Sequence, residues 1–322
     1  MKITILGLGV IGTTYGYAFQ KAGHTVRHWV RESKRESAPA ALEVRLFDGR
    51  TDPKGEAVGD TYPVELANRG EESDFILIAV SAGKLEAAIQ TLEENDLRGT
   101  VLLFSGFWGE RAELGRILAG RPCVMGYPVA GGSLQDGVLD CVLFDHVMLA
   151  GESDAAAPNY PALLKLLASA RLKAEVPYDI LQWIWLHMAI NAGVITTAGK
   201  YGDVSDTAQA ARTVMASSAA LSEAVLCIRE TAKIVASRGV PLGKFANELL
   251  PYRIPSRIAG AVMRRMFASN ELTRRIMELH SNPDDLLYVC RSVYECGRAN
   301  GVRAGRFDRN YEELVRQLDK LR

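Results

Sequence analysis

The sequence predicts a mixed α/β fold, in which a doubly wound parallel sheet is followed by an all-α domain. Short β-rich runs alternate with helical stretches in the first half, and the second half shows helical periodicity almost without interruption. At 322 residues, the chain is too long for one ordinary hydrophobic core and suits two domains. We place the boundary near Val176, which gives domains of residues 1–176 and 177–322.

The first domain is predicted from five strands and the helices between them. Candidate strands, which are short β-rich runs, occur at residues 2–6, 25–30, 75–80, 101–104 and 123–126. Helical segments separate several of these runs, at residues 10–22, 84–93 and 110–118. Continuous apolar strands that alternate with helices indicate a parallel sheet covered on both faces. Residues 42–63 are more polar, and we expect a small hairpin inserted in the sheet.

In the remainder of the chain we expect a few further strands, followed by helices. Residues 137–152 predict two edge strands around Asp145, and residues 155–171 and 174–177 predict a helix and a final strand. Apolar residues at three- and four-residue spacing predict helices at residues 179–197, 206–238, 259–267 and 283–300. The long segment 206–238 is either the interface of a homodimer or the core of the second domain.

Composition and charge limit the class of protein. Hydrophobic residues make up 48% and charged residues 24%, as in soluble globular proteins, and the formal net charge is zero. Neither nucleic acid nor an anionic membrane is therefore indicated as a partner. No run of about eighteen apolar residues occurs, which argues against a membrane span. The N-terminal apolar run contains three glycines and does not resemble a signal peptide, so we expect a cytoplasmic protein.

The cysteines and histidines do not predict a metal site. The chain has no CxxC motif, and its only HxxxH pair, His24 and His28, falls on a predicted strand. We expect His28 to be a surface or core residue. Reduced core thiols are the simplest interpretation of the five cysteines, which lie in apolar segments: Cys123, Cys141, Cys227, Cys290 and Cys296.

A glycine motif lies between the first predicted strand and the first helix. Its residues are Gly7, Leu8, Gly9, Val10, Ile11 and Gly12. In a GxGxxG motif the first glycine allows a tight turn, the second allows the backbone to approach a pyrophosphate, and the third allows close packing of helix and strand. The helix N-terminus supplies free N–H groups and the positive end of a dipole. The motif therefore predicts a Rossmann-type dinucleotide site rather than a plain turn.

The end of the second strand bears on the choice between NAD and NADP. A carboxylate there would accept from the ribose 2′-hydroxyl, whereas an arginine would pair with a 2′-phosphate. Arg31 stands about twenty residues after the glycines, with Lys34 and Arg35 following. We therefore predict NADP(H) as the cofactor. Glu32 would serve a ribose if the register shifted by one residue, and the basic residues could also form a solvated loop.

The chain resembles the ketopantoate reductase family over nearly its whole length. The N-terminal KITILGxGxxG, Arg31, the segment Gly126 to Gly132 and the helical second half carry the resemblance. The resemblance implies a second domain of the 6-phosphogluconate dehydrogenase C-terminal type. It also implies an oxidoreductase that uses NADPH to reduce a 2-keto acid.

Several family positions carry different residues here. Where the family has a lysine four residues before an asparagine, this chain has His187 followed by Asn191. Asp285 is the nearest match to a family glutamate that binds substrate. Ser81 and Ser105 stand in place of a family lysine and asparagine that follow two of the strands. The scaffold therefore matches better than the catalytic set, and ketopantoate itself is not predicted as the substrate.

The substituted residues can still serve carbonyl reduction. His187 could donate a proton as general acid, and Asn191 would share its helical face. Asp285 could orient the imidazole or bind substrate. Alternatively, His187 is only a buried core residue. Asp284 and Asp285 could simply belong to the first turn of an ordinary helix whose N-cap is Ser281 or Asn282.

Further candidates follow the strands of the first domain. Ser81 and Ser105 come after strand ends, where ligands of open parallel sheets bind, and either could contact the nicotinamide ribose or the substrate. Lys84 either reaches a phosphate or begins a helix. Residues 128–132 are expected to form a loop close to the nicotinamide.

Three functions fit these residues. The first is NADPH-dependent reduction of a 2-keto acid to the 2-hydroxy acid. The second is an opine-type dehydrogenase that reduces an imine, because a histidine paired with a carboxylate resembles the arrangement in those enzymes. The third is a regulator that binds NADPH without catalysis.

Overall fold

The computed structural model describes residues 1–155, 157–279 and 283–320, without the side chains of residues 283 and 284. The chain divides into two compact units, Met1–Leu181 and Gln182–Arg322. The predicted parallel-sheet domain followed by helices is confirmed. The division falls slightly after Val176, because the first two residues of helix α6 (Ile180–Tyr201) are grouped with the first unit.

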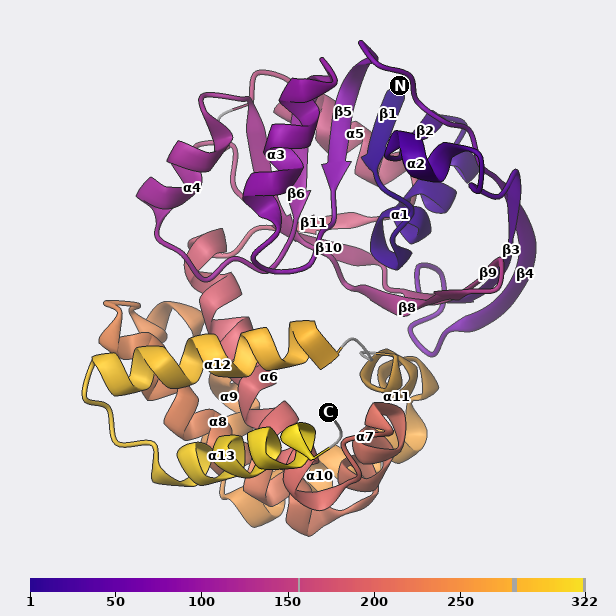
Figure 1. Cartoon of the computed structure of the whole chain (residues 1–322). Helices are drawn as coiled ribbons and strands as arrows, with labels where there is room; N and C mark the ends of the chain where they lie inside the picture. The colour runs from indigo at the N-terminus through magenta and orange to yellow at the C-terminus, as the bar shows by residue number, and fades with distance from the viewer. Residues whose placement is uncertain (156, 280–282, 321–322) are drawn as a thin grey trace. The chain divides into compact units, whose positions relative to one another are not determined.

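The larger sheet of the first unit has the strand order β11-β10-β7-β6-β5-β1-β2. Strand β10 pairs antiparallel with β7, and the other neighbours are parallel. The strands are β1 (Lys2–Leu6), β2 (Thr25–Trp29), β5 (Glu72–Ile78), β6 (Arg98–Phe104), β7 (Cys123–Tyr127), β10 (His146–Leu149) and β11 (Lys173–Glu175). The helices of this unit are α1 (Val10–Lys21), α2 (Glu32–Arg35), α3 (Leu85–Glu94), α4 (Arg111–Leu118) and α5 (Tyr160–Ser169). Helices α3 and α4 cover one face of the sheet, while α1 and α5 lie on the other (Figure 1).

The strand order reverses direction at β1. The chain continues from β1 to β2 on one side and resumes with β5 on the other side of β1. In open α/β sheets, ligands bind outside the carboxyl ends of the strands at such a switch point. The glycine motif after β1 and the loop after β5 both lie at this edge.

A second, smaller sheet corrects two predictions. Its order is β4-β3-β9-β8, formed by β3 (Ala41–Asp48), β4 (Glu56–Pro63), β8 (Ala130–Gln135) and β9 (Val138–Leu143). The hairpin predicted within residues 42–63 therefore exists but is not inserted in the main sheet. The two strands around Asp145 belong to different sheets. In β3 buried and exposed residues alternate, which suits a sheet with one solvated face rather than a parallel sheet covered on both sides.

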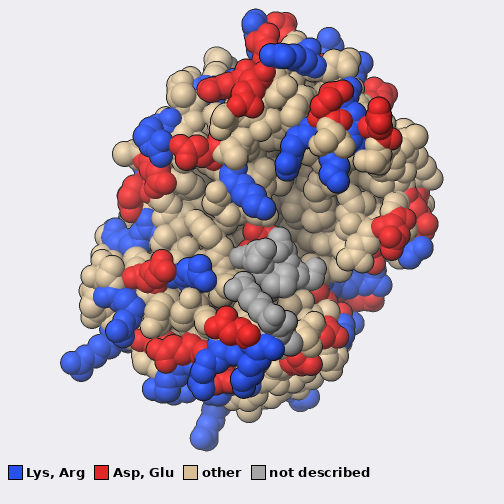
Figure 2. Space-filling model, viewed as in Figure 1, with Lys and Arg blue, Asp and Glu red and all other residues tan. Residues whose placement is uncertain are grey.

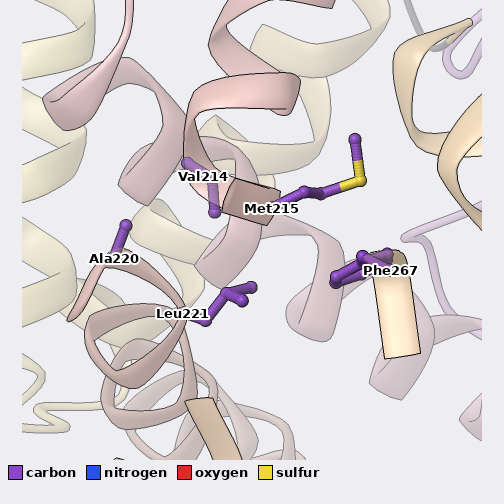
Figure 3. Close-up of a cluster of buried hydrophobic side chains, with 5 residues drawn as sticks. All are labelled: Val214, Met215, Ala220, Leu221 and Phe267. Carbon is purple, nitrogen blue, oxygen red and sulfur yellow. The ribbon is translucent and has the colours of Figure 1, made fainter. Parts of the chain in front are cut away.

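The second unit consists of helices. They are the rest of α6, then α7 (Thr207–Ala216), α8 (Ser218–Ser237), α9 (Ala246–Arg253), α10 (Ser256–Ser269), α11 (Glu271–Glu278), α12 (Pro283–Ala299) and α13 (Gly305–Asp319), with a 3₁₀ turn at Leu242–Phe245. Val214, Met215, Ala220, Leu221 and Phe267 pack together where α7, α8 and α10 meet (Figure 3).

The prediction of a single helix at residues 206–238 is wrong. It is two helices, α7 and α8, with a bend of 101° between them. The Ser217 hydroxyl accepts a hydrogen bond from the Ala220 N–H and so caps a new helix start. The buried face of α8 favours the core alternative for this segment over a homodimer interface. Among the described helices, none alone is long and apolar enough to cross a membrane, although α7 and α8 together pass that test by length and composition.

The state of the cysteines and the distribution of surface charge can be compared with what the composition indicates. None of the five cysteines forms a disulfide; four are buried and Cys296 is half-buried. On the face shown in Figure 2, positive and negative side chains are interspersed.

Candidate functional site

The glycine motif forms the turn between β1 and α1. Gly7 has φ of +90°, which glycine adopts without strain, and its N–H donates to the Trp29 carbonyl at 2.8 Å. A Cβ atom on Gly12 would lie 2.7 Å from Cγ2 of Ile5. Only a glycine there lets α1 approach β1 this closely, so the helix N-terminus is held directly above the end of the strand.

The N-terminal end of α1 is open to an anion. Gly9 is the capping residue and has no side chain to occupy the free N–H groups, and the first turn contains no acidic residue. A Cβ atom on Gly7 or Gly9 would meet nothing within 4 Å. Within the described ranges, the N–H groups of Leu8 and Gly9 have no hydrogen-bond partner. Free N–H groups at the positive end of a helix dipole suit a pyrophosphate, and Val10 and Ile11 line this turn half-buried.

A buried histidine lies directly behind the glycine turn. His28 on β2 is fully buried, with Nδ1 2.8 Å from the Gly7 carbonyl oxygen and Nε2 2.8 Å from the Tyr62 hydroxyl. Burial lowers the pKa of His28 to about 4, so the ring is neutral at pH 7. The sequence prediction treated His28 only as a surface or core residue. His28 pairs with Ile5 of β1 and is a polar residue at an inward-facing strand position. That pattern could have indicated a buried, hydrogen-bonded histidine.

The basic segment after β2 provides two unengaged cations. Arg31 and Lys34 are exposed, and neither side chain has a hydrogen bond or ion pair to any part of the chain that the structure describes. Arg35, in contrast, donates to the Ala67 carbonyl and to the Asn68 side chain. Glu32 is almost fully exposed and lies 4.0 Å from Arg35. Arg31 and Lys34 are therefore available to bind a phosphate, whereas Arg35 holds the loop.

The predicted serines lie at the same edge of the sheet but differ in availability. Ser105, after β6, is buried, and its hydroxyl donates to the Val80 carbonyl at 2.8 Å. This hydrogen bond connects the loops that follow β5 and β6. The Ser105 hydroxyl can then only accept, and not donate, a hydrogen bond from a ligand. Ser81 is half-buried in the loop after β5. Lys84 is the N-cap residue of α3 and begins that helix.

The segment at residues 128–132 is not a loop as predicted. Strand β8 begins at Ala130, and Gly132 lies against β9, where a Cβ atom would be 2.9 Å from the Cα atom of Cys141. The glycine thus serves close strand packing. Only Pro128 and Val129 connect the two strands, and the Val129 N–H donates to the buried Tyr15 hydroxyl of α1 at 3.1 Å.

In the second unit, one face of α6 carries the predicted catalytic residues. This helix is apolar and largely buried, but His187 and Asn191 are both half-buried and lie one turn apart. The His187 ring stacks on Trp183 with 4.8 Å between ring centres and 12° between planes. Stacking on the indole face fixes the plane of the imidazole.

Both tryptophans of this helix are packing residues. Trp183 and Trp185 are 8% and 5% exposed. The Arg238 guanidinium lies 3.5 Å above the centre of the Trp185 ring. Both side chains are therefore held by packing rather than exposed on the surface.

Asp285 lies in the first turn of α12 and is half-buried. The predicted caps Ser281 and Asn282, and the side chain of Asp284, lie outside the described residues. Among the residues that are described, no group of three histidines, cysteines or carboxylates is arranged to bind a metal ion.

Comparisons with known proteins agree with this architecture. Residues 3–141 match the family model of ketopantoate reductase PanE/ApbA. The 2-dehydropantoate 2-reductase of Vibrio cholerae serotype O1 is 24% identical over 205 residues, which are 60% of this chain and 62% of that protein. The chain thus matches about three fifths of the length of its curated relatives. The predicted resemblance to this family is confirmed.

Solved structures show the same fold over the whole chain. The complex of D-mandelate dehydrogenase with NADH and anilino(oxo)acetate has a TM-score of 0.66 at 17% identity and covers 100% of this chain and 99% of that one. Yersinopine dehydrogenase has a TM-score of 0.66 at 12% identity and covers 99% of this chain and 91% of that one.

Proposed function

We propose that this chain, a relative of the ketopantoate reductases, binds NADP(H) and reduces a 2-keto acid to the corresponding 2-hydroxy acid. The observation that carries the proposal is the open N-terminus of α1 at the switch point of the sheet. The uncapped first turn, the free N–H groups of Leu8 and Gly9 and the absence of an acidic residue in that turn fit the pyrophosphate of a dinucleotide. Arg31 would pair with the 2′-phosphate.

A nicotinamide cofactor, when bound, would supply a hydride to the keto carbon. We assign to His187 the proton that the carbonyl oxygen then requires, because an imidazolium can give up a proton near neutral pH. The Asn191 side-chain amide, on the same face of α6, would donate a hydrogen bond to the same substrate. Asp285 is the proposed carboxylate partner, which would either orient the imidazole or bind a polar group of the substrate.

A cofactor-oxidation assay tests this function. The purified protein is mixed with NADPH or NADH and a panel of 2-keto acids, and loss of the reduced nicotinamide is followed by absorbance. We expect NADPH oxidation with at least one keto acid in the absence of any amine. Nucleotide binding without turnover on any substrate would favour the regulator, and failure to bind either nucleotide would contradict the proposal.

An imine reductase is the second candidate, and His187 is the observation that favours it. By the resemblance to the ketopantoate reductases, His187 stands where that family has a lysine, and yersinopine dehydrogenase has the same fold. The same assay separates the candidates when each keto acid is tested with and without amino acids. Turnover that requires the amine would assign the protein to C=N reduction.

Arg31→Ala is expected to weaken NADPH binding about tenfold while changing NADH binding less than about twofold, because one charge-assisted contact to the 2′-phosphate is lost. Titration of both nucleotides by fluorescence measures the two affinities. Glu32→Gln is the matched control from the same turn. If Arg31→Ala weakens both nucleotides equally, Arg31 does not recognise the 2′-phosphate. If Glu32→Gln weakens NADH selectively, the glutamate binds the ribose.

A further inference from the structure

We propose that His28 is a positioning residue of the dinucleotide site, which aims the Leu8 N–H at the phosphates by holding the Gly7 carbonyl from behind. This inference rests on the proposed binding of a nucleotide. His28 does not contact the open side of the loop. It acts through a single peptide group, the one that joins Gly7 to Leu8.

The hydrogen bonds of His28 determine where its proton lies. The Gly7 carbonyl oxygen is only an acceptor, so Nδ1 must carry the hydrogen in the 2.8 Å contact. The neutral ring then has Nε2 as an acceptor, and the Tyr62 hydroxyl donates to it at 2.8 Å. Burial of Tyr62 also raises the pKa of its hydroxyl, which keeps the hydroxyl protonated as a donor. One tautomer therefore satisfies both contacts.

The ring has little freedom to leave this position. The His28 N–H donates to the Glu65 carbonyl at 2.8 Å, and its own carbonyl accepts from the Ala67 N–H at 2.9 Å. Tyr62 is itself enclosed, because a Cβ atom on Gly16 of α1 would lie 2.8 Å from its hydroxyl oxygen. The pair of side chains thus connects β2, β4 and α1 beneath the glycine turn.

Peptide geometry carries this constraint to the ligand side. In a planar trans peptide, the C=O and the following N–H point in opposite directions. Because the Gly7 carbonyl points at His28, the Leu8 N–H points away from it. That N–H has no partner in the described part of the chain, and the adjacent positions on Gly7 and Gly9 are open. Without the histidine, this peptide could rotate and present its carbonyl, which would repel a phosphate.

Direct nucleotide titration of two variants tests the inference. His28→Leu removes the hydrogen bond to Gly7 and is expected to weaken NADPH and NADH equally, by about tenfold. His28→Asn keeps a donor close to the Nδ1 position and is expected to stay within about threefold of the wild type. Equal loss of both nucleotides distinguishes His28 from Arg31, and affinities are compared only for folded protein as judged by circular dichroism.

A second measurement needs no variant. Nitrogen NMR of histidine-labelled protein at pH 7 is expected to show a buried neutral imidazole protonated at Nδ1, assigned to His28 by its loss in His28→Asn. A ring protonated at Nε2 would overturn the inference, as would wild-type affinity in folded His28→Leu. Failure of the wild type to bind either nucleotide would overturn the proposed function, and this inference with it.

Discussion

His187→Ala is expected to lower the turnover number by about 10²- to 10⁴-fold, the usual contribution of a general acid, while the Kd for NADPH changes less than about twofold. The two effects separate because the glycine motif belongs to the first unit and His187 to the second. Turnover is measured with the keto acid identified in the cofactor-oxidation assay. The Kd is measured by fluorescence titration in the absence of substrate.

Two variants control this result. His187→Gln retains a hydrogen-bond donor but cannot give up a proton near neutral pH, so it should be nearly as impaired as His187→Ala. Trp183→Phe retains an aromatic ring beneath the imidazole and should keep most of the activity, although it weakens the stacking seen at 4.8 Å. Normal turnover in His187→Ala would remove this residue from the site and transfer the proton donation to another group.

The sequence was most informative where one local pattern determines the structure. Strands β5 and β6 of the main sheet contain continuous apolar runs at residues 75–78 and 101–104, and the turn at Gly7 and the close packing at Gly12 follow from the spacing of the glycines. The five cysteines, which lie in apolar segments, form no disulfide among themselves. These features depend on residues close together in the chain, so a local pattern suffices to predict them.

The errors arose where distant residues decide. The apolar periodicity continues through Ser217, so it could not show that α7 and α8 meet at a sharp bend. Gly132 was interpreted as a loop residue because nothing near it in sequence shows that β9 packs against it. His28 depends on Tyr62, which lies on a strand that was predicted only as part of an inserted hairpin.

Lowering the pH from 7 to 5 is expected to reduce the stability of the wild type by about 2 kcal/mol more than that of His28→Asn. The pKa of His28 is about 4 in the folded protein and near the ordinary value of about 6.5 in the unfolded chain. Between these values the unfolded chain binds a proton that the folded protein does not, so unfolding becomes easier as the pH falls. This contribution to stability is complete above about pH 6.5 and is lost progressively towards pH 4.

Urea unfolding of both proteins at the two pH values measures the difference. The groups that surround the imidazole do not titrate in this range: Tyr62 stays protonated, and Gly7 and Glu65 present backbone carbonyls. His24 also has a lowered pKa, but it is present in both proteins and cancels in the comparison. Carboxylates with lowered pKa values, such as Asp60 at about 2, lose their contribution only at lower pH. Equal losses of stability in the two proteins would therefore mean that His28 accepts a proton in the folded protein. That result is incompatible with a neutral ring that donates to the Gly7 carbonyl and accepts from the Tyr62 hydroxyl.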